Sequence, residues 1–312
     1  MSIQPPLRHL LSLQDLPRPA LETLLNDADR IASGPSRNSS LRERHVGRSV
    51  VNLFFEASTR TRSSFQIAAQ RIGADVLNFD VAQSSARKGE TLLDTFLNLQ
   101  AMGCELFVVR VAEQDVLQTL ADASRPGVGL VNAGDGRANH PTQGLLDMLT
   151  IRQHKGRDFS ALRVLLVGDI LHSRVARSDL HALRTLGTGE IRVCGPQALL
   201  PGDATLDGCH VFDRLDAAIE GVDVVMMLRL QRERMEEGLI GSLDDYHRDY
   251  GLGAARLRRA SPEAIVTHPG PMNRGVEISD EVADGPQSVI LQQVANGVAV
   301  RMAVLDHVLS VT

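Results

Sequence analysis

Short apolar runs alternate along the chain with segments in which apolar residues recur at helical spacing. The run at 49–55 predicts a buried strand, and the apolar residues of 60–72 predict a helix that ends at Gly73. A further apolar segment at 75–79 predicts a second strand. A strand, a helix and a strand in this order predict a β-α-β unit, in which the two strands run parallel.

The same alternation continues through the rest of the chain. Further strands are predicted at 106–109, 128–131, 164–167, 191–194, 211–212, 223–228 and 265–267, and further helices at 21–32, 92–99, 115–123, 141–154, 175–183 and 289–309. This order predicts an α/β fold with two doubly wound domains, each a mostly parallel sheet flanked by helices. We expect the active site in the interdomain cleft.

The length of 312 residues exceeds the usual size of one hydrophobic core. Because the helix 141–154 is followed by Gly156, we place the boundary there and expect domains 1–150 and 151–288. The last segment, 289–312, is predicted to be a helix that packs back on the first domain. Its apolar face is expected to comprise Val294, Val298, Met302 and Leu305.

Composition narrows the class of protein. The 33 basic and 38 acidic residues give a net charge of −5, with no basic run and no interleaved aromatic residues, so nucleic acid is not an expected partner. No apolar run approaches the roughly 20 residues of a membrane span, and no signal peptide is apparent. Cys104, Cys194 and Cys209 lie far apart without a C-x-x-C pair, which indicates a reducing compartment and no structural zinc. We expect a soluble, cytoplasmic protein.

Ser58, Thr59, Arg60 and Thr61 lie where the first strand stops and a helix begins. A helix start leaves backbone N–H groups unpaired and carries partial positive charge, so hydroxyl and guanidinium groups there can bind a tetrahedral oxyanion such as phosphate. The alternative is that Ser58 only caps the helix and the arginines are solvated. A second arginine, Arg62, beside the hydroxyls favours a ligand.

Other polar residues also follow predicted strands. Arg110, His140 and Arg229 each come after an apolar strand. Ligands of open α/β sheets bind beyond the carboxyl ends of the strands, so Arg110 and His140 can converge with the Ser58 motif there. His268-Pro269-Gly270-Pro271 follows the last predicted strand and is either a rigid turn or part of a ligand site.

Two further segments leave alternatives open. The polar loop 80–90 is either solvated surface or a loop that closes over a ligand. The segment 168–174 opens a helix directly after a strand, as in half of a dinucleotide site, but it lacks the G-x-G-x-x-G pattern. A nicotinamide cofactor is therefore not expected.

With these motifs the chain resembles the aspartate/ornithine carbamoyltransferase family over nearly its whole length. Ser58-Thr59-Arg60-Thr61-Arg62 and His140-Pro141-Thr142-Gln143 are shared across that family. Arg229-x-Gln231-x-Glu233-Arg234 and His268-Pro269-Gly270-Pro271 look like its aspartate enzymes, and the His-Cys-Leu-Pro motif of the ornithine enzymes is missing.

The resemblance implies transfer of the carbamoyl group of carbamoyl phosphate to the amine of L-aspartate, an early step of pyrimidine biosynthesis that needs no cofactor and no metal. It implies that domain 1–150 binds carbamoyl phosphate and domain 151–288 binds aspartate. In the first domain the phosphate would be held by Ser58, Thr59, Arg60 and Thr61, the carbonyl oxygen polarised by Arg110, His140 and the Thr61 hydroxyl, and the carbamoyl amide bound by Gln143.

In the second domain the resemblance implies that Arg174 binds the α-carboxylate of aspartate and Arg229 its side-chain carboxylate, assisted by Gln231. Pro269 and Gly270 would contribute their backbone. Arg274 stands where the family pattern is interrupted, so no role is carried over to it.

The resemblance also implies partners. Ser84 and Lys88 match loop residues that reach into the neighbouring subunit's site, which implies a cyclic homotrimer with shared active sites. The segments 172–178 and 273–278 look like those of bacterial members whose trimers assemble with a dihydroorotase or a dihydroorotase-like chain.

Two other functions remain open from the residues. One is a carbamoyltransferase for ornithine or an N-acylated relative, although the ornithine cation would be repelled by Arg229. The other is a catalytically silent scaffold, although such a scaffold needs none of the site charges of Arg60, Lys88, Arg110, Arg174 and Arg229.

Overall fold

The computed structural model describes residues 7–14, 16–34, 39–80, 90–231 and 242–312. The chain forms two compact units. Unit 1 comprises Met1–Leu145 and Asn296–Thr312, and unit 2 comprises Leu146–Ala295. The chain passes from unit 1 to unit 2 within helix α6 (Pro141–Lys155) and returns within helix α12 (Ile290–Leu309).

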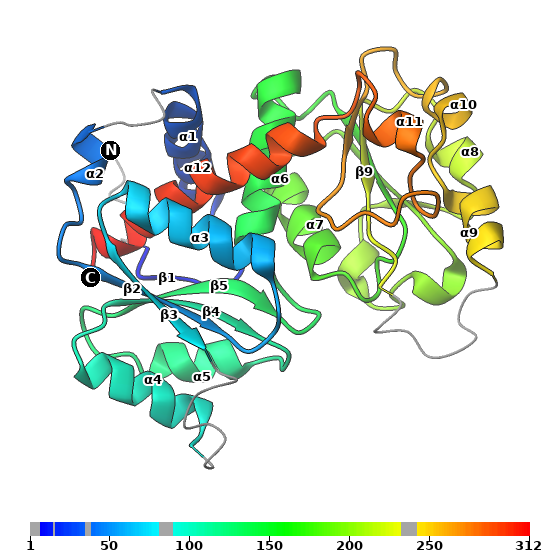
Figure 1. The fold of residues 1–312 in the computed structure, drawn as a ribbon. Coiled ribbons are helices and arrows are strands. Elements are labelled where there is room, and N and C mark those ends of the chain that lie inside the picture. Colours follow the sequence, from blue (N-terminus) through cyan, green and yellow to red (C-terminus); the bar gives the residue numbers. More distant parts are fainter. Residues whose placement is uncertain (1–6, 15, 35–38, 81–89, 232–241) are drawn as a thin grey trace. The chain divides into compact units, whose positions relative to one another are not determined.

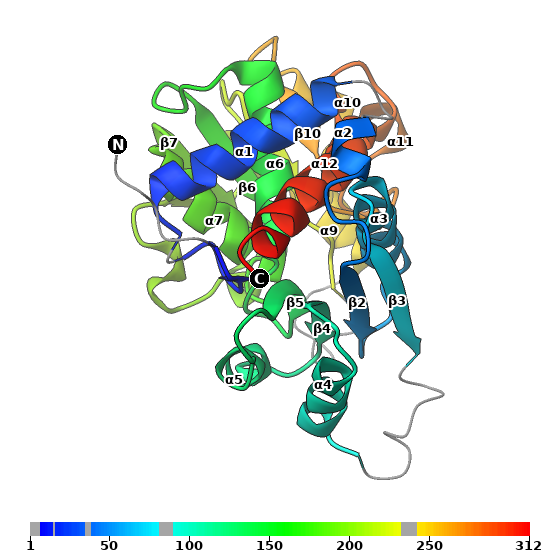
Figure 2. The same ribbon diagram turned by 90° about the vertical axis from the view of Figure 1, so that its left-hand side faces the viewer.

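Unit 1 is built on a five-stranded sheet (Figure 1). Its strands are β1 (His9–Leu10), β2 (Ser49–Phe54), β3 (Asp75–Asp80), β4 (Leu106–Val111) and β5 (Gly129–Asp135). Their order is β1-β5-β4-β2-β3, and every pair runs parallel. Figure 2 shows β3 beside β2 at the margin of this sheet.

Helices cover both faces of the unit 1 sheet. Figure 1 shows α3 (Thr59–Arg71) and α12 over one face, with α4 (Leu92–Ala101) and α5 (Val116–Asp122) over the other. On the first face the guanidinium of Arg301 lies 5.0 Å from the ring centroid of Phe65. On the second, Phe96 and Leu117 are buried against the strands. Helices α1 (Arg18–Ser33) and α2 (Ser39–Arg42) complete the unit.

Unit 2 repeats this plan. Its strands are β6 (Arg163–Val167), β7 (Glu190–Cys194), β8 (His210–Phe212), β9 (Val224–Met227) and β10 (Ile265–Thr267). They are ordered β10-β9-β6-β7-β8, again all parallel. The helices that the unit adds are α7 (Arg174–Leu186), α8 (Leu215–Ala218), α9 (Leu243–Tyr250), α10 (Ala254–Leu257) and α11 (Asp280–Ala283).

The predicted fold class, two parallel sheets flanked by helices, is confirmed. Several strands differ from their predictions at their ends, and one was not predicted at all. Strand β5 continues to Asp135, because residues without an apolar period, such as Asn132, still pair with β4. Strand β1 was not predicted, since its two residues are too few to show a period. No helix among the described residues is both long and apolar enough to cross a membrane.

The apolar face predicted for the last helix is wrong in its first half. Met302 and Leu305 are buried, but Val294 is 52% exposed. The inward position beside it is Gln293, which is 1% exposed. The Gln293 side chain accepts a hydrogen bond from the His268 backbone N–H at 3.0 Å and donates one to Asp147 at 2.6 Å. Polar contacts therefore decide which face of this half of α12 turns inward.

Within unit 1 the C-terminal half of α12 is held by a cluster of charged and polar side chains around Asp306. Asp306 contacts Arg44, and its carboxylate lies 2.7 Å from Nε2 of His45, which is 4% exposed. Burial raises the pKa of Asp306, but the hydrogen bond from His45 and the charge of Arg44 outweigh it and hold the pKa below its usual value of 3.8. The Asp306 carboxyl group therefore stays ionised to lower pH in the folded protein than in the unfolded chain.

We expect Asp306→Asn to lower the free energy of unfolding at pH 7 by about 1.5–3 kcal/mol, the usual contribution of hydrogen bonds to a charged group. Because the folded-state pKa is depressed, this contribution is present above pH 3.8 and disappears as the pH falls through the folded value. Urea unfolding of the wild type and of the variant at pH 7 and at pH 3 measures the difference in stability at each pH. Glu22→Gln, which breaks the exposed pair with Arg18, is the control and should change stability little. An equal loss at both pH values would contradict the assignment.

Candidate active site

In unit 1 the predicted site residues follow three neighbouring strands, β5, β4 and β2. Ser58 to Thr61 follow β2, Arg110 lies near the end of β4, and His140 follows β5. Phe54 pairs with Arg110 across the ladder, and Val111 pairs with Asp135. Parallel strands end at the same edge of a sheet, so the structure brings these residues to one edge of unit 1.

The Ser58 motif forms the start of α3. Ser58 occupies the position before the first helical residue, yet its side chain makes no capping hydrogen bond. The first turn of α3 holds no acidic residue, and its backbone N–H groups keep the positive end of the helix dipole. Thr59 and Arg60 are exposed, whereas Thr61 is buried. The capping role considered for the Ser58 hydroxyl is thus absent, and the helix start retains the properties of an anion site.

Arg110 is held in one orientation by two acceptors. Its guanidinium donates to the Ala133 carbonyl at 3.2 Å and pairs with the Glu56 carboxylate at 3.1 Å. The side chains of Arg110 and Glu56 are 12% and 20% exposed. Sequence reasoning missed Glu56, although its place directly after the β2 strand was a usable signal.

His140 and Gln143 lie at the start of α6 and are both buried, 5% and 8% exposed. The loop that delivers them is closed by Asp135, whose carboxylate accepts from the Asn139 N–H at 2.6 Å. The Gln143 N–H in turn donates to the His140 carbonyl at 2.9 Å. These contacts fix the backbone of both residues at the end of β5.

Unit 2 shows the same arrangement at β10, β9 and β6. Arg174 is the first residue of α7, after β6, and is 6% exposed. Arg229 and Gln231 follow β9, and Pro269 and Gly270 follow β10. The structure therefore brings these residues to one edge of unit 2.

The loops after β6 and β9 are tied together. The Gln231 side chain donates to the His172 carbonyl at 3.1 Å, and Nδ1 of His172 lies 2.9 Å from the Asp169 carboxylate. Burial is the largest influence on Asp169 and raises its pKa against the opposing hydrogen bonds from His172. Sequence reasoning missed this pair, because Asp169 was read only as part of an incomplete dinucleotide motif.

The turn after β10 is fixed by a buried histidine. His268 is 1% exposed, and its ring accepts the Gly270 N–H at Nδ1 over 2.8 Å. Arg274, further along the same turn, pairs with Asp280 at 2.7 Å and with Asp284 at 2.8 Å. Arg274 therefore anchors α11 in this structure. Ser84, Lys88, Glu233 and Arg234 lie outside the described residues.

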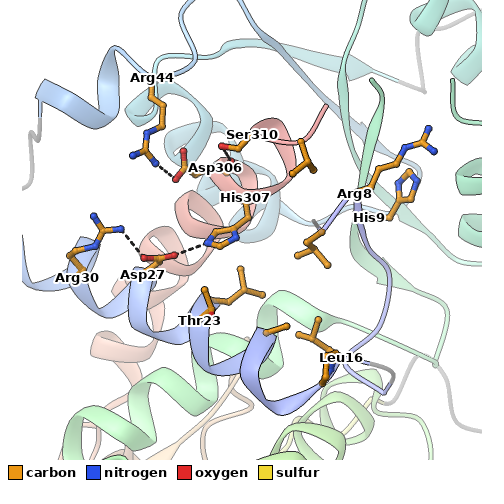
Figure 3. Close-up of a pocket in the computed structure, with 15 residues that line it drawn as sticks. Arg8, His9, Leu16, Thr23, Asp27, Arg30, Arg44, Asp306, His307 and Ser310 are labelled. Carbon is orange, nitrogen blue, oxygen red and sulfur yellow. Dashed lines mark hydrogen bonds and ion pairs between the residues drawn. The ribbon is translucent and has the colours of Figure 1, made fainter. Parts of the chain in front are cut away.

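A cavity of about 620 Å³ in unit 1 contains none of the predicted site residues (Figure 3). It lies among α1, the N-terminal segment and the end of α12. Its charges are engaged with other protein groups: Asp27 pairs with Arg30 at 2.7 Å and with His307 at 2.6 Å, and Arg8 donates to backbone carbonyls. We therefore treat this cavity as separate from the predicted site.

Each of the two α/β units has a parallel sheet. Arginine and amide or hydroxyl groups lie at the strand ends of each sheet. This arrangement is typical of a protein that binds small anionic molecules. Within the described ranges, no group of three or more His, Cys, Asp or Glu side chains could hold a metal ion.

Comparison with known proteins makes the class specific. Residues 8–153 match the family model described as aspartate/ornithine carbamoyltransferase, carbamoyl-P binding domain, and residues 160–308 match that of the Asp/Orn binding domain. The chain is 64% identical over 304 residues to the aspartate carbamoyltransferase catalytic subunit of Stenotrophomonas maltophilia strain K279a, which covers 97% of this chain and 96% of that protein. The chain therefore belongs to the aspartate/ornithine carbamoyltransferase family, as its motifs predicted.

Solved structures agree with this membership. Aspartate transcarbamoylase from Trypanosoma cruzi, in complex with carbamoyl aspartate and phosphate, matches with a TM-score of 0.86 and 31% identity over 99% of this chain and 100% of that chain. Ornithine carbamoyltransferase from Thermus thermophilus has a TM-score of 0.84 at 24% identity over 97% and 99% of the two chains, and shares the fold.

Two of the serines at helix starts, Ser58 and Ser173, give a matched test of the site. Ser173 caps α7 by accepting from the Ala176 N–H, whereas Ser58 makes no such bond. We expect Ser173→Ala to lower the free energy of unfolding by about 1 kcal/mol, as lost caps usually do, and Ser58→Ala to leave it unchanged. Urea unfolding of both variants measures the difference. An equal loss in the two would make Ser58 a structural cap.

Proposed function

We propose that this protein transfers the carbamoyl group of carbamoyl phosphate to the amine of L-aspartate, giving N-carbamoyl-L-aspartate and phosphate. The observation that carries the proposal is the gathering of the Ser58 motif, Arg110 and His140 at the ends of three neighbouring strands, in the unit that matches a carbamoyl-P binding domain. The 64% identity to an aspartate carbamoyltransferase catalytic subunit supports aspartate as the acceptor.

The phosphate of carbamoyl phosphate binds at the start of α3 in this proposal. Ser58, Thr59, Arg60 and Thr61 supply hydroxyl, guanidinium and backbone N–H donors, and the helix dipole favours the same charge. Arg60 compensates the negative charge that grows as the C–O bond to phosphate breaks. No acidic residue in the first turn opposes this anion.

The carbonyl oxygen gains negative charge when the amine attacks the carbamoyl carbon. Arg110, His140 and the Thr61 hydroxyl donate to that oxygen, and Gln143 binds the carbamoyl amide. Because Glu56 and the Ala133 carbonyl already hold the Arg110 guanidinium, little reorganisation is needed as the charge develops. Each such donor lowers the barrier by roughly 3–4 kcal/mol. The departing phosphate takes the amine proton.

Aspartate is bound by unit 2 in this proposal. Two carboxylates suit two guanidinium groups, so Arg174 binds the α-carboxylate and Arg229, assisted by Gln231, the side-chain carboxylate. Pro269 has no N–H, and the Gly270 N–H is donated to His268, so the backbone of these two residues offers carbonyl oxygens only. Those oxygens suit the N–H groups of the amine and the carbamoyl amide. Transfer then requires that carbamoyl phosphate, bound by unit 1, and aspartate, bound by unit 2, react with each other.

A cyclic homotrimer with shared sites is part of the proposal. Strand β3 is the last of its sheet, and no described strand pairs with its outer edge. Parallel sheets are usually covered on both faces, yet Leu77 of β3 and Ile67 of α3 are 43% and 39% exposed. The segment that carries Ser84 and Lys88 follows β3 directly. This uncovered edge supports contact with a second copy of the chain.

The proposal extends to location and assembly. A cytoplasmic location is supported by three cysteines that form no disulfide. Assembly of the trimer with a dihydroorotase or dihydroorotase-like chain is supported by the motif resemblance at 172–178 and 273–278.

The purified chain should form N-carbamoyl-L-aspartate from carbamoyl phosphate and L-aspartate, and no product from L-ornithine. Arg60→Ala should lower turnover at least about 100-fold, because a donor to the developing charge is lost, while the circular dichroism spectrum stays unchanged. Product assays measure transfer, calorimetry measures phosphate binding, and the molecular mass in solution gives the oligomeric state. Transfer to ornithine would establish the other acceptor class, and phosphate binding without transfer to either would leave a catalytically silent scaffold.

Shared sites can be tested by mixing two inactive variants. Arg60→Ala and Lys88→Ala trimers, allowed to exchange subunits, should regain partial activity, because some hybrid sites combine an intact Arg60 with a neighbour's intact Lys88. Wild-type trimers mixed with each variant control for exchange, and mass spectrometry measures it. Full exchange without recovered activity would rule out a site shared through Lys88.

A further inference from the structure

Glu277 is a fully buried carboxyl group behind the turn that carries Pro269 and Gly270. Its exposed fraction is 0%, and it is preceded by exposed residues of the same loop. Its Oε1 lies 3.1 Å from Nε2 of His268 and accepts the backbone N–H of Asn273 at 2.6 Å. Burial of a carboxyl group costs stability unless its hydrogen bonds compensate, so such a residue needs an explanation.

The contacts of the His268 ring determine its tautomer. Nδ1 accepts the Gly270 N–H, so Nδ1 carries no proton. Nε2 then carries the ring proton and donates it to Glu277. By accepting the Nε2 proton, Glu277 favours the neutral tautomer of His268 in which Nδ1 can accept the Gly270 N–H.

The turn is fixed at both ends through this pair. Gly270 has a φ of +64°, which residues with a side chain rarely adopt, and the bond to His268 holds its N–H in that conformation. The Asn273 N–H closes the far side of the turn on the same Glu277 oxygen. The Glu277 carbonyl accepts from the Leu252 N–H at 2.9 Å, so the carboxyl group itself stands on a fixed backbone.

We propose that Glu277 is a positioning residue for the acceptor amine: through the His268 tautomer and the Asn273 N–H, it aims the carbonyl oxygens of Pro269 and Gly270 at the substrate N–H groups. This inference rests on the proposed function. It goes beyond it by assigning a specific task to a residue that touches neither substrate.

The alternative is that Glu277 only stabilises unit 2. A structural role predicts that any variant of equal stability loss has the same kinetics. A positioning role predicts that the Michaelis constant for aspartate rises when the side chain at position 277 cannot accept a hydrogen bond. The constant should stay the same when the side chain can accept one. The variants below separate these two effects.

Glu277→Met keeps the side-chain length but removes the acceptor, whereas Glu277→Gln keeps one oxygen for both N–H donors. We expect Glu277→Met to raise the Michaelis constant for aspartate about 10- to 100-fold, since displacements of about 1 Å at a site have effects of that size. Glu277→Gln should stay within about twofold of the wild type. Inorganic phosphate binding, which belongs to unit 1, should be unchanged in both. Leu215→Ala, a core change elsewhere in unit 2, controls for lost stability.

¹⁵N NMR of the histidine ring nitrogens provides a readout that needs no enzymatic activity. In the wild type and in Glu277→Gln, His268 should be the neutral Nε2–H tautomer, and in Glu277→Met it should become a mixture. If the wild type fails to carbamoylate aspartate, the proposed function is wrong, and the tautomer still reports on the Glu277 contact.

An unchanged Michaelis constant in a folded Glu277→Met variant would overturn the positioning role, as would an equal rise in Leu215→Ala. If Glu277→Met does not fold, Glu277→Asp replaces it, because it withdraws the carboxylate by one methylene. That variant should show an intermediate rise, and kinetics and ring signals identical to those of the wild type would likewise overturn the inference.

Discussion

Parallel pairing of the strands is the constraint on which the candidate site residues of each unit depend. A parallel strand can follow another only after the chain has crossed back over the sheet, so all strands of such a sheet end at one edge. In unit 1 the order β5-β4-β2 brings His140, Arg110 and the Ser58 motif to that edge. In unit 2 the order β10-β9-β6 does the same for Gly270, Arg229 and Arg174. One topological rule thus gathers the candidate site residues of each unit, which lie far apart in the sequence, at one edge of its sheet.

Behind each edge lies a carboxylate that orients another polar side chain. Glu56 pairs with Arg110, Asp169 with His172, and Glu277 with His268. Asp169 and Glu277 are 0% exposed, and burial of a carboxylate costs stability unless its hydrogen bonds compensate. Such pairs are understandable where a cation or a backbone segment must be held in one orientation before charge develops on a substrate.

Much of the fold could be predicted because its signals are local. The β10 strand and the α6 helix lie where their apolar residues predicted them, and those apolar residues are buried. The pattern failed at Val294 and at the end of β5. In both places a polar residue is inward or paired, Gln293 through the His268 backbone and Asn132 through the β4 ladder.

The sequence by itself determined the α/β alternation, the motifs at strand ends and the family, because these depend on short-range spacing and residue type. It also proposed most of the site residues, each within a few positions of a strand end. Only the tertiary structure decided the strand order, the freedom of the Ser58 hydroxyl from capping, and the acids behind Arg110, His172 and His268. Those features depend on register and on hydrogen-bond geometry between segments, which periodicity along a chain does not encode.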